Sequence, residues 1–138
     1  MPATLETLLQ RYPGATTFTY GDSAALSARL VALTASGAKT ATTGALRDYE
    51  TGDEVLPCVG RRDIVLGWDG APVLVIETLE VVTCRFDAVT EEMALAEGEN
   101  DDRAGWAADH AAYFARNGGY APDMLVVWER FRVIADLT

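Results

Sequence analysis

The feature that most constrains the fold is a pair of β-rich segments joined by a tight turn. Residues 63–68 and 72–82 are rich in branched aliphatic residues, and the Asp69-Gly70 dipeptide between them is a hairpin signal. The second segment begins with an uninterrupted apolar run, which is typical of a strand buried on both faces. We therefore expect an antiparallel hairpin whose second strand lies in the middle of a sheet.

Helical patterns alternate with further strand patterns along the chain. Amphipathic spacing, with capping residues or glycine at the ends, predicts helices over residues 5–12, 24–36, 90–97 and 103–116 and one helical turn over 45–50. β-branched and aromatic residues predict strands over residues 16–20 and 124–134. Strands with inserted helices are typical of the α+β class, so we expect the 138 residues to form a single domain with a curved, mostly antiparallel sheet.

The charge balance restricts the partners. The chain has 21 acidic residues against 11 Lys and Arg, a formal net charge of −10. Such a chain repels a polyanion, so nucleic acid is not an expected partner, whereas a small uncharged ligand meets no such barrier. No apolar run is long enough to cross a bilayer and the first ten residues lack a signal pattern, so we expect a cytoplasmic protein without a membrane partner. The oligomeric state stays open, a homodimer included.

Metal and disulfide chemistry have little support in the sequence. Cys58 and Cys84 are far apart and form no CxxC pair, so both are interpreted as reduced and structural. His110 is the only histidine, and no carboxylate or second histidine is spaced with it as in a metal site. The acidic stretch 97–102 lacks the spacing of a calcium loop and is interpreted as a solvated turn that caps the next helix. We predict no metal and no cofactor.

Lys39 and Thr42 are the strongest candidates for chemistry. They follow Gly37, where an amphipathic helix is expected to end, and a lysine there is also explained by the helix dipole. An amine close to a hydroxyl, however, is a pairing by which a weak nucleophile is activated. The neighbours Thr40 and Thr43 are small enough to let a ligand approach the backbone, so we expect both to contact substrate.

Several motifs together resemble the ASCH-domain family. They are Tyr20-Gly21-Asp22-Ser23, the segment from Gly37 to Thr42 with Lys39, Glu77-Thr78, Glu97-Gly98-Glu99 with Trp106 and His110, and Asp123 to Val127 with Phe131. The resemblance implies a small, mostly antiparallel PUA-like β-barrel surrounded by helices. It implies one ASCH domain over residues 1–138, in which residues 1–15 are an N-terminal helical extension. It also implies one of two activities: some members are amidohydrolases acting on N4-acetylcytidine and related N4-acylated cytosines, and others are described as RNA-binding proteins or ribonucleases.

The resemblance to the amidohydrolase members implies catalytic roles for Lys39, Thr42 and Glu77. Thr42 would attack the amide carbonyl, and Lys39, with a pKa lowered by burial, would accept the hydroxyl proton. Glu77 would orient the amine or protonate the leaving cytosine nitrogen. A surface position is the alternative for Glu77, but a carboxylate in an apolar strand is costly without a partner. The alternative function is a single-stranded RNA-binding module or ribonuclease on the same fold.

The expected ligand is a modified pyrimidine nucleoside or base. Tyr20 and Trp68 could stack on the pyrimidine ring, because every base has a π-face that aromatic side chains can cover. For Trp68 a hairpin residue covering the core is the alternative. Glu97 is expected to help position Lys39 or the substrate. His110 is interpreted as a core or rim residue on the helix that also carries Trp106.

Overall fold

The expected hairpin forms the centre of a five-stranded sheet in the computed structural model, which describes residues 4–51 and 55–138. Strands β3 (Arg62–Leu66) and β4 (Pro72–Arg85) pair antiparallel, and β4 lies between β3 and β5 (Leu125–Asp136). Three consecutive residues of β4, Leu74, Val75 and Ile76, are fully buried. The prediction that this strand lies in the middle of the sheet is therefore confirmed.

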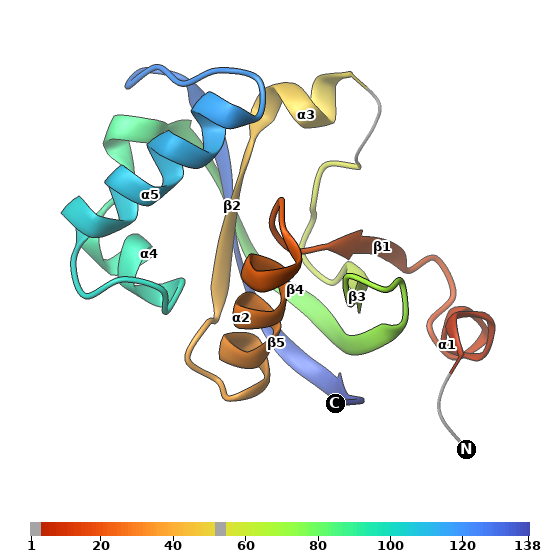
Figure 1. Ribbon diagram of the computed structural model, residues 1–138. Helices are drawn as coiled ribbons and strands as arrows, with labels where there is room; N and C mark the ends of the chain where they lie inside the picture. The colour runs from red at the N-terminus through yellow and green to blue at the C-terminus, as the bar shows by residue number, and fades with distance from the viewer. Residues whose placement is uncertain (1–3, 52–54) are drawn as a thin grey trace.

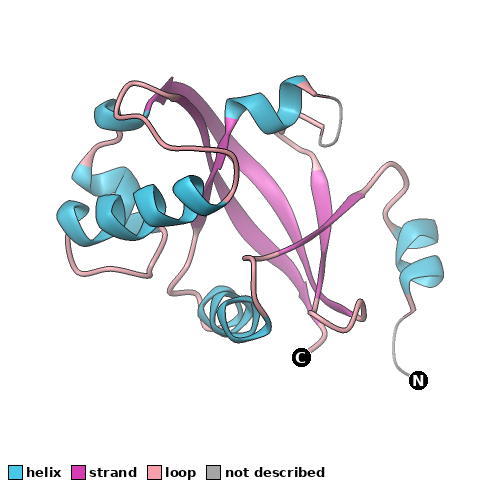
Figure 2. Cartoon of the chain, turned by 45° about the horizontal axis from the view of Figure 1, so that its top comes forward, coloured by secondary structure: helices cyan, strands magenta, loops and turns pink. Residues whose placement is uncertain are grey.

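The sheet is mixed and curls into a half-barrel (Figures 1 and 2). Its strand order is β1-β3-β4-β5-β2, with β1 (Thr16–Thr19) and β2 (Ala41–Ala45) at the two edges. Among the strand pairs of the described residues, β1–β3 is parallel and the other three are antiparallel. Register shifts in β4 mark bulges, which increase local twist and so help the sheet to curl. The expected PUA-like α+β fold is confirmed, as a barrel open between β1 and β2.

Helices pack on both sides of the sheet. They are α1 (Leu5–Arg11), α2 (Ala24–Ala35), α3 (Leu46–Glu50), α4 (Glu91–Ala96) and α5 (Arg103–Arg116), with a short 3₁₀ turn at Phe86–Ala88. Ser23, Thr90 and Asp102 cap the N-termini of α2, α4 and α5, because each side chain accepts a backbone N–H in the first turn of its helix. None of the helices among residues 4–51 and 55–138 combines the length and apolar character needed to cross a bilayer.

The core has three parts, one under each group of helices. Around α4 and α5, Trp106, Phe86 and Phe114 pack together with residues of β5. Around α2, the cluster contains Tyr20, Leu30 and Phe131, and around α1 it contains Leu8, Ile64 and Val75. The curled sheet thus holds α2 and α5 on either side of the strand β2, as Figure 1 shows.

Strand β2 was not predicted from the sequence, where a helix was expected to end at Gly37 and a helical turn to follow over residues 45–50. Ala41–Ala45 instead pairs antiparallel with β5, and Thr42 lies directly opposite Glu129. Five residues with a glycine among them carry little intrinsic strand preference, so the long neighbouring strand β5 decides the conformation. The pairing places Thr42 and Thr43 on a rigid element.

Candidate active site

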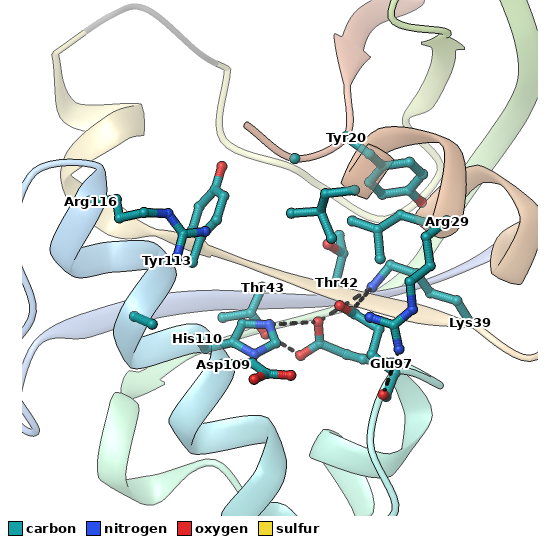
Figure 3. A pocket seen from close by; sticks show the side chains of 15 residues that line it. Tyr20, Arg29, Lys39, Thr42, Thr43, Glu97, Asp109, His110, Tyr113 and Arg116 are labelled. Carbon is teal, nitrogen blue, oxygen red and sulfur yellow. Dashed lines mark hydrogen bonds and ion pairs between the residues drawn. The ribbon is translucent and has the colours of Figure 1, made fainter. Parts of the chain in front are cut away.

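Lys39 lies at the entrance to β2 with its amine enclosed by oxygen atoms. The side chain is 1% exposed. Its Nζ donates to the carbonyl oxygen of Ala41 at 2.8 Å, to Glu99 Oε2 at 2.8 Å and, with a longer contact of 3.4 Å, to Glu97 Oε1. All three N–H donors of an ammonium group therefore point at acceptors. Figure 3 shows Lys39 and Thr42 among the side chains that line one pocket.

Glu97 is the buried centre of the cluster. Its Oε1 contacts Lys39 and, at 3.3 Å, His110 Nε2. Its Oε2 accepts the Thr43 hydroxyl at 2.8 Å and the indole N–H of Trp106. The His110 ring stacks on Trp106 with centroids 4.5 Å apart. Donors from β2, from α5 and from the loop before β2 hold this carboxylate, so its position is fixed.

The Glu97-Gly98-Glu99 turn reaches Lys39 because of the glycine between the two glutamates. Gly98 has φ +72°, and a Cβ there would lie 2.2 Å from the carbonyl oxygen of Ala38. Thr40 ties the same two segments together, since its backbone N–H and its hydroxyl both donate to the carbonyl oxygen of Ala96, at 2.8 and 2.9 Å. The turn after α4 and the chain entering β2 are thus in backbone contact.

The electrostatics of the cluster differ from the expectation for a lysine base. Burial alone lowers the pKa of Lys39, but the charges of Glu97 and Glu99 outweigh burial and the pKa is raised above its usual value. Burial opposes ionisation of Glu97, yet Lys39 and His110 lower the pKa of this carboxyl to about 2. The pKa of His110 is raised, because its contact with Glu97 outweighs burial. The expected lowering of the Lys39 pKa is wrong: the resting site holds an ammonium ion.

Two hollows meet at Thr42. The smaller, of about 250 Å³, lies between α2 and α5 and contains the Lys39 cluster. The larger, of about 740 Å³, is a groove along the open side of the half-barrel between β1 and β2. Tyr20, Gly21, Thr42, Thr43 and Tyr113 line both. Thr42 therefore lies at the junction of a small chamber and a larger one.

The predicted site residues fall into two groups. Tyr20, Lys39, Thr42, Thr43 and Glu97 all line the smaller hollow. Burial raises the pKa of Tyr20 to about 12, so its hydroxyl is neutral. Its ring is only 4% exposed and lies 5.8 Å from Lys39 Nζ, so Tyr20 forms a wall of the hollow.

Glu77, Trp68 and Thr40 lie elsewhere. The carboxylate of Glu77 pairs across the sheet with Arg132 at 2.9 Å and Arg62 at 3.3 Å, and it lines neither hollow. These two arginines compensate the negative charge of Glu77 and so explain why a carboxylate is tolerated in an apolar strand. Trp68 is 54% exposed next to the β3–β4 turn, away from both hollows, so neither the stacking role nor the core alternative holds. Thr40 binds the Ala96 carbonyl, a structural role.

Glu99 and His110 belong to the site, and the sequence interpretation missed both. Glu99 makes the 2.8 Å contact with Lys39 that was assigned to Glu77, and Arg29 donates to its carbonyl oxygen at 3.0 Å. The Glu97-Gly98-Glu99 motif was the available signal, because a glycine between two carboxylates permits a close backbone approach. Apart from the positioning role expected of Glu97, this stretch was interpreted as a solvated turn instead.

The same residues offer the donor atoms of a metal site. Ligand atoms of Glu97, Glu99 and His110 lie within 4.8 Å of one another, so the expectation that His110 has no carboxylate neighbours is wrong. The Lys39 ammonium, however, already contacts both carboxylates. A divalent cation would have to displace a buried positive charge, so the geometry favours the lysine as the resident cation.

The fold and the Lys39 cluster define the class of protein. It is a PUA-like α+β domain with a lysine–carboxylate site at the open side of a half-barrel. The sequence profile of the ASCH domain matches residues 16–135. The chain therefore belongs to the ASCH-domain family.

Solved structures agree with this assignment. An ASCH domain from Lactobacillus crispatus JV V101 is 28% identical with a TM-score of 0.80, and covers 95% of this chain and 86% of its own. The protein EF3133 from Enterococcus faecalis V583, which carries the family label DUF984, is 31% identical with a TM-score of 0.84 and coverages of 96% and 86%. An ASCH protein from Zymomonas mobilis shares the fold at 10% identity, with a TM-score of 0.55 and coverages of 86% and 65%. No curated protein matches the chain.

Proposed function

We propose that the protein is an amidohydrolase that removes the acyl group from N4-acylated cytosine bases or nucleosides, with Thr42 as the nucleophile. The observation that carries the proposal is the buried Lys39 ammonium, bound to two carboxylates, in the hollow that Thr42 lines. A hydroxyl beside a group that relays protons is the arrangement that nucleophilic catalysis requires.

The contacts support a relay in which Lys39 stays charged. Lys39 gives a proton to Glu99 Oε2 across the 2.8 Å hydrogen bond, and the freed amine lone pair takes the proton of Thr42 Oγ1 as this oxygen bonds to the carbonyl carbon, which restores the ammonium within the step. The raised pKa of Lys39 fits this exchange better than a neutral amine in the resting enzyme. Glu99 thus replaces Glu77 as the acid/base residue of the proposal.

The second half of the reaction uses the same groups. When the tetrahedral intermediate collapses, its C–N bond breaks and the protonated Glu99 gives its proton to the leaving nitrogen. An acyl ester on Thr42 remains. A water molecule then attacks the ester, its proton follows the same relay to Glu99, and the carboxylic acid leaves with Thr42 Oγ1 reprotonated. Glu97, held by four donors, keeps Lys39 in position throughout.

The charged side chains that line the larger hollow favour a neutral substrate over RNA. Carboxylates of Asp48, Asp63 and Glu129 line the larger hollow against one guanidinium, Arg61, which is engaged by Asp63. A polyanion would meet these carboxylates without the basic surface that phosphate binding needs. Tight, salt-sensitive RNA binding in a gel-shift assay at low salt would reverse this ranking.

The test is to incubate the purified protein with N4-acetylcytidine and follow cytidine by chromatography. We expect turnover that survives EDTA, because Lys39 supplies the positive charge that a metal would otherwise bring. Thr42→Val, which keeps the shape and strand preference of the side chain, should show no turnover above the uncatalysed rate. Loss of activity in EDTA that one divalent ion restores would favour a metal bound by Glu97, Glu99 and His110.

A matched pair of variants tests the acid/base assignment. Glu99→Gln should lower kcat/KM by about 10²–10⁴-fold, the usual contribution of general acid–base catalysis. Glu77→Gln removes a carboxylate of the same type that pairs with arginines outside the hollows, and it should leave kcat/KM within about twofold of wild type, since it touches neither hollow. The reverse ranking would contradict the relay.

A further inference from the structure

Thr42 lies where two hollows of different size and chemistry meet, and an amide substrate also has two unequal sides. The smaller hollow, about 250 Å³, has Leu26 and Leu30 in its wall beside the Lys39 cluster. The larger groove, about 740 Å³, lies within the range of pockets that hold whole small molecules, whereas the smaller hollow lies below it. The larger and the smaller part of the substrate, on the two sides of the scissile bond, can therefore be assigned to the larger and the smaller hollow.

The groove has the features that a nucleoside needs. Its two long sides are the sheet edges β1 and β2, whose outward backbone N–H and C=O groups can pair with the polar edge of a flat base. Phe18 and Tyr49 supply aromatic faces. Gly44 makes room for Tyr49, because a Cβ on Gly44 would lie 2.9 Å from the Tyr49 hydroxyl.

The groove is also negatively charged. Asp48 lies at its α3 side, while Asp63 and Glu129 are 1% and 5% exposed in its floor. Arg61 is the one guanidinium among the described lining residues. Carboxylates accept hydrogen bonds from ribose hydroxyls but repel a phosphate.

We propose that the groove between β1 and β2 holds the leaving nucleoside, with a ribose hydroxyl donating to the exposed carboxylate of Asp48, and that the acyl group occupies the smaller hollow. The enzyme then selects nucleosides over free bases and excludes nucleotides and RNA. This inference rests on the proposed amidohydrolase function and adds its substrate class.

The experiment compares three acetylated substrates that differ only outside the amide: N4-acetylcytosine, N4-acetylcytidine and N4-acetylcytidine 5′-monophosphate. We expect kcat/KM for the nucleoside to exceed that for either other compound by about tenfold or more, because one satisfied hydroxyl or one excluded phosphate is worth about this factor. Raising the salt concentration should reduce the difference in kcat/KM between the nucleoside and the monophosphate, because salt screens charge. It should leave the difference between the nucleoside and the free base unchanged.

Two lysine substitutions on α3 separate the effect of charge in the groove from the effect of the net charge of the protein. Asp48→Lys places a cation at the groove wall, and it should raise kcat/KM for the monophosphate, relative to the nucleoside, by about three- to tenfold at low salt. Glu50→Lys is the matched control, because Glu50 is exposed on α3 but does not line the groove. It makes the same change in net charge and should alter the ratio by less than about twofold.

The outcomes separate the two proposals. Turnover of the nucleoside with equal rates for the free base and the monophosphate would overturn the groove assignment and leave the amidohydrolase intact. Equal effects of Asp48→Lys and Glu50→Lys would also overturn it, since net charge would then explain the result. An absence of turnover of all three compounds would instead overturn the proposed function, and the groove assignment with it.

Discussion

At the residue scale, Lys39 shows how neighbours decide what a buried group can do. An isolated ammonium loses its proton on burial, and the expectation from the sequence rested on that effect. The carboxylates of Glu97 and Glu99 reverse the sign and keep the group charged. The lysine is therefore suited to relaying a proton and to stabilising the negative charge of a tetrahedral intermediate.

The pH dependence of the reaction tests this state of Lys39. We expect kcat/KM for N4-acetylcytidine not to rise between about pH 7 and 9, because the raised pKa of Lys39 keeps its ammonium group charged across this range. Initial rates corrected for spontaneous hydrolysis at each pH provide the measurement. A tenfold rise per pH unit in this range would instead indicate a neutral lysine acting as the base.

At the scale of elements, the site depends on a tight approach between the turn after α4 and the start of β2. Gly98 allows it, since the position needs both a positive φ and the absence of a Cβ. The glutamates on either side then reach the same amine from one turn. One short turn thereby supplies both carboxylates. Its backbone contact with the chain at Lys39 fixes its position.

Gly98→Ala should therefore damage stability and activity together. A methyl group 2.2 Å from the Ala38 carbonyl oxygen forces the backbone apart, whereas at Gly60, with a similar φ of +89°, an added Cβ would meet nothing within 4 Å. We expect Gly60→Ala to cost about 1–3 kcal/mol through strain alone, and Gly98→Ala to cost about 1–3 kcal/mol more. Chemical denaturation of both variants measures the difference, and equal costs would show that the contact is unimportant.

At the scale of the whole molecule, the half-barrel contains a buried network of opposite charges, and its stability should therefore depend on pH. The pKa of Glu97 is lowered from 4.5 to about 2, so its contribution is present above about pH 4.5 and is lost as the pH falls towards 2. The pKa of His110 is raised from 6.5, so its contribution is present below pH 6.5 and is lost as the pH rises through the higher folded value. Stability should be greatest between these limits.

We expect the free energy of unfolding to fall by about 3 kcal/mol on the acid side from Glu97 alone, since its pKa is lowered from 4.5 to about 2 and each pKa unit corresponds to about 1.36 kcal/mol. It should also fall as the pH rises above 6.5 and through the higher pKa that His110 has in the folded protein. Urea unfolding across this range is the measurement, and His110→Gln is the control because it removes the group responsible for the second fall. An unchanged slope in this variant would contradict the role assigned to His110.

Sequence patterns were sufficient to predict the features that depend on neighbouring residues. The hairpin around Asp69-Gly70 and the helices capped by Ser23, Thr90 and Asp102 follow from turn chemistry and periodicity, which act over a few residues. The motif resemblance likewise indicated the family and directed attention to Lys39 and Thr42. Local patterns are sufficient for these conclusions because the physical causes are local.

Long-range packing determines which carboxylate contacts Lys39. Glu77 and Glu99 are equivalent as sequence letters, but bulged pairing of β4 with β5 brings Glu77 to Arg132, while the turn at Gly98 brings Glu99 to Lys39 across 60 residues of chain. The edge strand β2 and the sign of the Lys39 pKa shift depend on the same long-range contacts. Electrostatic energy depends on the distance between charges in space, and the separation of two residues along the chain does not specify that distance.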